Sequence, residues 1–413
     1  DHRDLHVRSR RQRQMCIRDR HIIIRSMNDL SNQNWSFPVP IRYGPGRLKE
    51  LQEICQKNKI NNPLIITDKG SANLDFILAL HSVLKNEGFG VDIFSEISPN
   101  PRDIEVINGK RKYHEGNHDG IIGIGGGSGM DGAKALSLIA NNDYDIWDFE
   151  WEKNPPVINN SNFPPLICIP TTAGTGAETE SSAMVTDTQL LVKWCIAHPN
   201  QKPLEVILDP ELTIQLPKNL TAWTGIDALV HAIEAYVIDD FHPLCDGAAL
   251  EALRLIYPNL PIVYEKGEDL TSRGKMLVGS CLAGISFLKG LGFVHAISHM
   301  VGAEYDTQHG LTNAIVLPSV LRFNKDGMGS KISVMSEAMG LKKNDFDYFY
   351  KSICDLLDQF EIPKKLSDIK VKDSSVKSLA KKALKDSAFA TNPKTATLEE
   401  MMELIETSIN YGR

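Results

Sequence analysis

The sequence predicts an α/β fold with a parallel sheet over its first half, followed by an all-helical second half. Short β-branched runs alternate with helical patterns up to about residue 210, and after residue 211 the strand signal fades. The length supports the same division, because 413 residues are too many for one ordinary core. We therefore expect two domains, at residues 27–210 and 211–413, with a cleft between them.

Five apolar runs in the first half are predicted to be strands. They are "PLIITD" (63–68), "GVDIFSEI" (90–97), "GIIGIGGG" (120–127), "PLICIPTT" (165–172) and "LEVILDP" (204–210). Helical patterns lie between some of them, at residues 47–58 and 130–140. Strands that alternate with helices indicate βαβ units, so the sheet is expected to be parallel and covered on both faces.

Helices are predicted for the second half because its apolar residues recur at helical spacing. The segments that show this spacing are residues 220–237, 247–257, 376–388 and 397–409.

Composition and charge exclude several classes of partner. The chain is 42% hydrophobic with a net charge of −7 and no basic stripe in its body, so we expect no nucleic-acid partner. No apolar run approaches the roughly 18 residues of a membrane helix, so we expect no membrane partner. Seven scattered cysteines without a CxxC pair argue against disulfides and thiolate zinc sites. They favour a reducing compartment, and we expect the cytoplasm.

The first 26 residues differ from the rest. Residues 1–30 hold eight arginines and four aspartates, yet they lack the apolar core of a signal peptide. The stretch "RRQRQMCIRDR" (10–20) resembles the conceptual translation of a sequencing-library adapter. We interpret residues 1–26 as a non-native tail and expect the natural start at Met27.

Two polar loops that follow predicted strands suggest a nucleotide site. Gly125, Gly126 and Gly127 expose backbone N–H groups at the start of a helix, which is a favourable place for an anion. Ser128 and Asp131 are expected to cap this helix. The second loop, "PTTAGTGAETE" (170–180), offers hydroxyls and bare backbone. Each loop alone could be a plain turn, but two at one sheet edge favour a nucleotide.

Asp68 ends an early predicted strand. A carboxylate there can accept hydrogen bonds from ribose hydroxyls and repel a 2′-phosphate, so we expect NAD rather than NADP. A turn or helix cap is the alternative role for this aspartate.

Histidines gather on segments that otherwise read as buried helices. Asp227 and His231 are four residues apart, so both project from one face of one helix. His295 and His299 repeat this spacing on a second helix, and His309 follows in an expected loop marked by Gly310. Asp227, His231 and two of the three later histidines would suit Fe²⁺, Zn²⁺, Mn²⁺ or Co²⁺. Alternatively, each is a core histidine satisfied by a backbone carbonyl.

The sequence resembles the iron-containing (group III) alcohol dehydrogenases from residue 37 almost to the C-terminus. The motifs that carry the resemblance are "GGGSGMDGAKA", "PTTAGTGAE", "LDPEL", "TGIDALVHAIEAY", "HAISHMVGAEYDTQHGLTNAIVLP" and "ATNPKTATLEE". The resemblance implies a dinucleotide-binding domain followed by a metal-binding domain. It departs at Lys394, where the family often has arginine.

The resemblance also implies a role for individual residues. The metal ligands are expected to be Asp227, His231, His295 and His309, while His299 lines the cleft near the nicotinamide. His295 and His299 are then the catalytic histidines. The residues expected around the cofactor are Asp68, Asn100, Gly126, Gly127, Ser128, Asp131, Thr171, Thr172, Thr175 and Lys193.

The implied activity is reversible hydride transfer between a small primary alcohol, or another hydroxy compound, and NAD. The implied metal is Fe²⁺, with Zn²⁺ or another divalent ion as alternatives, and a homo-oligomer is expected. His299 either relays a proton or only orients the substrate. Substrate contacts are expected in residues 147–151, 180–184 and 282–293.

Other activities on this scaffold stay open at this stage. They are a maleylacetate reductase-like or hydroxyacid–oxoacid transhydrogenase-like enzyme, and a catalytically idle metal-binding module. A dehydroquinate synthase-like lyase is disfavoured by Asp227, because those enzymes tend to use a glutamate and two histidines.

Overall fold

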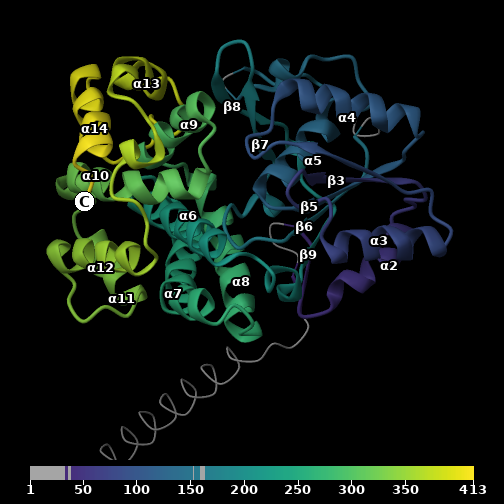
Figure 1. Cartoon of the computed structure of the whole chain (residues 1–413), viewed down its shortest axis with the longest axis horizontal. Coiled ribbons are helices and arrows are strands. Elements are labelled where there is room, and N and C mark those ends of the chain that lie inside the picture. Colours follow the sequence, from purple (N-terminus) through teal and green to yellow (C-terminus); the bar gives the residue numbers. More distant parts are fainter. Residues whose placement is uncertain (1–32, 36–38, 152, 159–162) are drawn as a thin grey trace, which may run out of the picture.

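A seven-stranded sheet forms the centre of the N-terminal lobe (Figure 1). The computed structural model describes residues 33–35, 39–151, 153–158 and 163–413, so the proposed tail and the start at Met27 lie outside it. In sheet order the strands are β1 (Gln33–Trp35), β2 (Ile41–Tyr43), β9 (Glu205–Leu208), β6 (Leu166–Pro170), β5 (Gly120–Gly125), β3 (Pro63–Asp68) and β4 (Asp92–Ile97). All neighbours pair in parallel except β1 and β2, which confirms the predicted parallel sheet.

Helices cover both faces of this sheet. They are α2 (Leu51–Lys57), α3 (Asp75–Asn86), α4 (Asp103–Glu115) and α5 (Gly127–Ile139). Figure 1 shows α2 and α3 on one side of the strands and α4 and α5 on the other. Alternate residues of β3 serve the two layers: Ile65 packs in the cluster of α2 and α3, while Leu64 and Ile66 pack in the larger core. This burial on both faces explains why the strands read as continuous apolar runs.

The C-terminal lobe is helical, as predicted. Its helices are α6 (Lys218–Val237), α7 (Pro243–Glu265), α8 (Leu270–Ser286), α9 (Phe293–Tyr305), α10 (His309–Met328), α11 (Lys331–Ala338), α12 (Phe346–Gln359), α13 (Val376–Ala383) and α14 (Leu398–Asn410). The helix expected over residues 376–388 is too long, because α13 ends at Ala383. A turn follows, in which Ala388 N–H donates to Asp386 Oδ1 at 2.9 Å.

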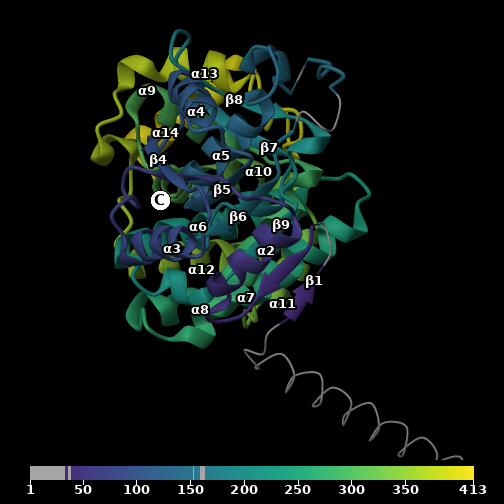
Figure 2. The ribbon, with the colours of Figure 1, turned by 90° about the vertical axis from the view of Figure 1, so that its right-hand side faces the viewer.

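An antiparallel hairpin of two strands contacts both lobes. Figure 2 shows the α/β lobe facing the viewer, with α6 and α10 of the helical lobe behind it and β7 near α5. β7 (Ser182–Asp187) and β8 (Val192–Ala197) form an antiparallel hairpin that the sequence analysis does not predict. The hairpin packs against α5 of the first lobe and α9 of the second. Lys382 Nζ donates to the carbonyl of Leu191 at its tip, at 3.1 Å.

No single helix among the described residues is both long and apolar enough to cross a membrane. Residues 270–289 and 293–305 reach that length and composition only when taken together, across a bend of 103°.

Two glycines bring the lobes into direct backbone contact. Gly176 has a φ of 64°, and Gly284 lies within α8. A Cβ on Gly284 would lie 2.5 Å from the carbonyl oxygen of Gly176, closer than real side chains come. The seam therefore has no room for a methyl group at this point.

We expect Gly284→Ala to destabilise the protein by about 1–3 kcal/mol, the usual cost of overpacking. Gly247→Ala is the matched control, because Gly247 also lies in a helix but a Cβ there would meet nothing within 4 Å. That substitution should stabilise by about 0.5–1 kcal/mol, since alanine favours helix over glycine. Chemical denaturation measures both, and equal stabilisation by the two substitutions would contradict the tight contact.

Candidate active site

The carboxyl ends of β3, β5 and β6 meet at one edge of the sheet. Asp68 ends β3, Gly125 ends β5, and Thr171 follows β6, with Thr171 N–H donating to the carbonyl of Gly125 at 2.9 Å. A Cβ on Gly126 would lie 3.4 Å from Thr172 Cγ2, and one on Gly127 would overlap Thr175. The glycine loop and the threonine loop therefore form one continuous surface, where ligands of open parallel sheets bind.

Helix α5 begins within the glycine loop, and the expected caps are wrong. In the described structure no side chain caps α5, because the helix starts directly at Gly127 after Gly126. Ser128 Oγ instead donates to the carbonyl of Pro99. Asp131 lies one turn further along, where it accepts from Met184 N–H at 3.3 Å and pairs with Lys134 at 3.2 Å. The start of α5 can therefore receive an anionic group.

Asp68 lies beside this loop. A Cβ on Gly125 would lie 3.0 Å from Asp68 Oδ2, so the carboxylate faces the glycine turn. Its two oxygens accept from the backbone N–H and the hydroxyl of Ser71, at 3.0 and 2.8 Å. These bonds orient the carboxylate at the strand end, and each oxygen still has acceptor capacity for a ribose hydroxyl.

Asn100 and Lys193 reach from this edge towards the helical lobe. Asn100 Nδ2 donates to Asp306 Oδ1 at 2.9 Å, just before His309, and Lys193 Nζ lies 3.5 Å from Asn100 Oδ1. Burial lowers the pKa of Lys193, although Asp131 and Asp227 oppose this shift. The sheet edge that carries the glycine and threonine loops is thus linked to the segment that precedes His309, the last predicted metal ligand.

The four predicted metal ligands converge from three helices. Asp227 and His231 come from α6, His295 from α9 and His309 from α10, and their donor atoms all lie within 4.8 Å of one another. The Nε2 atoms of the three histidines lie 3.8, 3.8 and 3.5 Å from the same atom, Asp227 Oδ1. Donors bound to one ion at about 2.0–2.2 Å in a tetrahedron lie about 3.4 Å apart.

Burial and mutual electrostatic interactions set the charges of the donor residues. Burial raises the pKa of Asp227, but the surrounding imidazoles outweigh it and hold that pKa well below its usual range. Burial lowers the pKa of His231 to about 4, so its imidazole is neutral near pH 7. Burial also opposes charge on His295, yet the neighbouring carboxylates of Asp227 and Glu234 outweigh it and raise the pKa of His295 to about 9. One anionic and several imidazole donors in a buried site fit a borderline divalent ion.

His309 does not lie in a loop, so that expectation is wrong. It is the first residue of α10, and Gln308 caps the helix by accepting from Leu311 N–H at 2.6 Å. A Cβ on Gly310 would overlap the carbonyl of Trp223, so the glycine permits close contact between α10 and α6. Gly310 therefore marks a helix contact rather than a chain turn.

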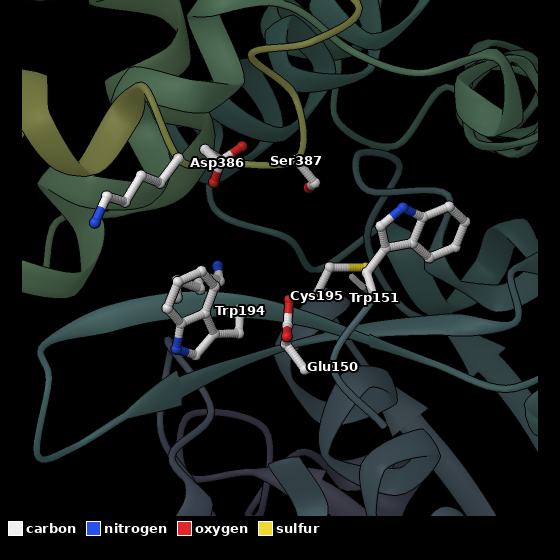
Figure 3. A pocket seen from close by; sticks show the side chains of 8 residues that line it. Glu150, Trp151, Trp194, Cys195, Asp386 and Ser387 are labelled. Atoms are coloured by element: carbon white, nitrogen blue, oxygen red, sulfur yellow. The ribbon is translucent and has the colours of Figure 1, made fainter. Parts of the chain in front are cut away.

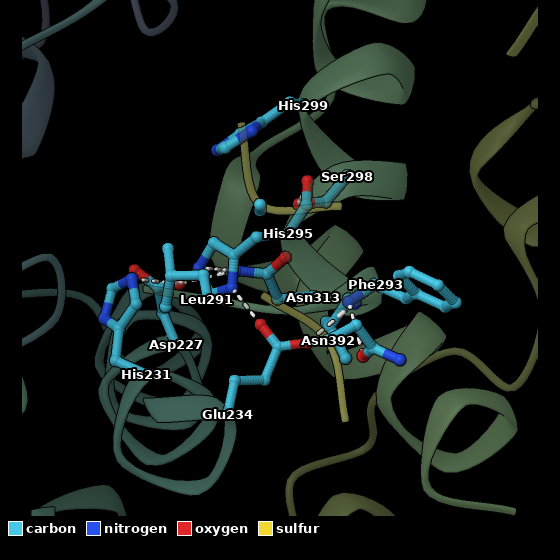
Figure 4. A network of polar contacts seen from close by, with 12 residues as sticks. Asp227, His231, Glu234, Leu291, Phe293, His295, Ser298, His299, Asn313 and Asn392 are labelled. Atoms are coloured by element: carbon cyan, nitrogen blue, oxygen red, sulfur yellow. Dashed lines mark hydrogen bonds and ion pairs between the residues drawn. The ribbon is translucent and has the colours of Figure 1, made fainter. Parts of the chain in front are cut away.

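Sequence reasoning missed four polar residues around the histidines, of which Figure 4 labels Glu234, Asn313 and Asn392. Glu234 Oε2 accepts from His295 Nδ1 at 2.6 Å, and Asp386 Oδ2 accepts from His299 Nδ1 at 2.9 Å. Asn313 Nδ2 donates to Asp227 Oδ1 at 2.6 Å. The fourth, Asn392, contacts the start of α9. Glu234 lies three residues after His231 and Asn313 four after His309, so helical spacing could have identified these two.

His299 lies beside the cluster without joining it. Its ring stacks on that of His309, with centroids 5.5 Å apart. The structure thus brings all three late histidines together, but only His295 and His309 share a common point with Asp227 and His231.

A small pocket lies where the hairpin faces the C-terminal segment (Figure 3). Asp386 and Ser387 line one side, and Trp194 and Cys195 of β8 line the other. Glu150 and Trp151 belong to one of the segments expected to contact substrate, and they also line this pocket. Because Asp386 also holds His299, the pocket borders the histidine cluster.

Similarity to known proteins covers nearly all of the described chain. Residues 38–210 match the family described as "Iron-containing alcohol dehydrogenase", and residues 221–409 match "Fe-containing alcohol dehydrogenase family, C-terminal". The chain is 33% identical to an NAD-dependent methanol dehydrogenase of Bacillus methanolicus over 91% of this chain and 100% of that protein.

Solved structures agree with this similarity. A 1,3-propanediol oxidoreductase superposes with a TM-score of 0.83 at 33% identity, covering 89% of this chain and 97% of the other. A sulfoacetaldehyde reductase from Bifidobacterium kashiwanohense in complex with NAD⁺ gives 0.80 at 27% identity, covering 93% and 99%. With both halves matched in order and the fold shared, this chain belongs to the iron-containing alcohol dehydrogenase family.

Proposed function

We propose that this chain oxidises small primary alcohols reversibly with NAD⁺, using Fe²⁺ held by Asp227, His231, His295 and His309. The observation that carries the proposal is the convergence of these four side chains beside the glycine and threonine loops. A Cβ on Gly174, in the threonine loop, would lie 2.7 Å from Thr224 Cβ on α6. The threonine loop therefore packs directly against α6, the helix that carries Asp227 and His231.

The chain's own residues supply binding, orientation and proton transfer. A bound divalent ion would stabilise negative charge on the alcohol oxygen, and NAD⁺ would accept the hydride. Asp68 would accept hydrogen bonds from the ribose hydroxyls of the cofactor, and the start of α5 would hold its pyrophosphate. Asp386 holds the Nδ1–H of His299, so His299 Nε2 is the atom that accepts a proton from the substrate hydroxyl.

The names of two relatives support the substrate class, since one is called a methanol dehydrogenase and the other a 1,3-propanediol oxidoreductase. We test it by following NADH absorbance with methanol, longer primary alcohols and diols. The protein should first be reconstituted separately with Fe²⁺ and Zn²⁺. NADH formation with small primary alcohols is expected, fastest with Fe²⁺. Metal-loaded protein that forms no NADH with any alcohol would contradict the proposal.

We also propose a cytoplasmic homo-oligomer. The cysteines of the described chain are unpaired, and Cys55, Cys168, Cys245 and Cys281 are buried, as suits a reducing compartment. Cell fractionation and light scattering test these two points separately.

We expect His231→Ala to lose bound metal and turnover together, because a donor atom is removed. Loss of a residue that only orients a metal ligand typically weakens metal binding by about 10–100-fold, and the loss in His231→Ala should be larger. His299→Ala is the matched control: it should keep its metal while turnover falls by about 10²–10⁴-fold. Elemental analysis and NADH absorbance measure the two quantities. Full turnover in metal-free His231→Ala protein would refute the role of the metal.

We expect Asp68→Gly to shift the cofactor preference towards NADP⁺. The kcat/KM for NAD⁺ should fall about tenfold or more, because a hydrogen bond to a charged group contributes about 1.5–3 kcal/mol. The ratio of kcat/KM for NADP⁺ to that for NAD⁺ should rise. Asp68→Asn keeps the shape and separates charge from size, and an unchanged ratio in both variants would contradict the assignment.

A further inference from the structure

Helix α9, which carries His295, begins without a local cap. Its N-cap residue is Gly292, which has no side chain to accept a hydrogen bond. Distant residues accept instead: Phe293 N–H donates to Asn392 Oδ1 at 3.1 Å, and Val294 N–H donates to Glu234 Oε1 at 2.8 Å. The start of α9 is therefore fixed by a helix on one side and by the C-terminal segment on the other (Figure 4).

Glu234 uses its second oxygen on the metal-ligand candidate itself. Oε1 accepts from the backbone of α9, and Oε2 accepts from His295 Nδ1 at 2.6 Å. Glu234 is only 3% exposed, so water does not weaken these hydrogen bonds. With Nδ1 held by Glu234, the other ring nitrogen of His295, Nε2, faces Asp227, whose Oδ1 lies 3.8 Å away.

The packing leaves little freedom at this junction. A Cβ on Gly292 would lie 2.7 Å from Glu234 Oε1 and 2.8 Å from Asn392 Oδ1. Asn392 is itself held, because it exchanges amide hydrogen bonds of 2.8 and 2.9 Å with Asn324. This accounts for the asparagine of the closing motif "ATNPK", to which the sequence analysis assigns no role.

We propose that Glu234 is a positioning residue for the metal site: one carboxylate fixes the start of α9 and the ring and tautomer of His295. The inference rests on the proposed function, because it presumes that His295 Nε2 binds a metal. A histidine whose other nitrogen donates to a carboxylate is held in the tautomer that binds metal, and loss of such a partner typically weakens binding by about 10–100-fold.

The test compares Glu234→Gln with Asp386→Asn in the full-length protein. Both partners of Glu234 are N–H donors, so glutamine, with one acceptor oxygen, must leave one of them facing its own NH₂ group. Asp386 is the matched control, because it accepts from His299 Nδ1 and from the backbone N–H of Ala388 in the same manner. Its histidine, however, lies outside the four-donor cluster.

The dissociation constants for Zn²⁺ and Co²⁺ are measured by competition with a chelator, together with the visible absorption of bound Co²⁺. We expect Glu234→Gln to bind both ions about 10–100-fold more weakly and to change the Co²⁺ spectrum. Asp386→Asn should bind both ions as the unaltered protein does.

Equal affinity in Glu234→Gln and the unaltered protein would overturn the inference, as would an equal loss in Asp386→Asn. An unaltered protein that binds neither ion would instead overturn the proposed function. Should Glu234→Gln fail to fold, Glu234→Asp replaces it, since it keeps the charge but shortens the reach. Weaker metal binding by that variant supports the inference, and unchanged binding refutes it.

Discussion

The structure depends on a buried carboxylate, Asp227, which is 2% exposed and surrounded by three imidazoles. Removing a charge from water costs several kcal/mol unless partners compensate it. Among the described residues, the imidazoles and the side-chain amide of Asn313 make polar contacts with this carboxylate. A divalent cation would satisfy all four donors at once, so the packing of α6, α9 and α10 serves to hold these atoms around a common point.

The second constraint is the contact between the lobes. The threonine loop packs on α6, and Gly176 contacts Gly284 of α8. Asn100 donates to Asp306 and Thr307, in the segment that precedes α10. Each contact joins a residue near the expected cofactor site to the helical lobe. Hydride transfer needs the reacting groups held about 3–3.5 Å apart, and a seam of backbone contacts is suited to that requirement.

Patterns within one segment predicted much of this architecture. Apolar runs located five strands of the sheet, and the four-residue spacing of Asp227 and His231 placed both on one face of α6. Contacts between distant residues could not be read in this way. Glu234 and His295 are 61 residues apart, and Phe293 and Asn392 are 99 apart. The β7–β8 hairpin was missed because its "SAMVTD" and "VKWCIA" strands lie in the seam, without clear alternation of apolar and polar residues. His309 was misplaced because its glycine neighbour serves helix packing.

Anomalous X-ray diffraction from crystals of the Fe²⁺-loaded protein, recorded at the iron absorption edge, is the most direct test. The account predicts a single strong peak that marks an iron ion within bonding distance of Asp227 and of the Nε2 atoms of His231, His295 and His309. A peak elsewhere, or iron that leaves these side chains unbound to it, would contradict the account.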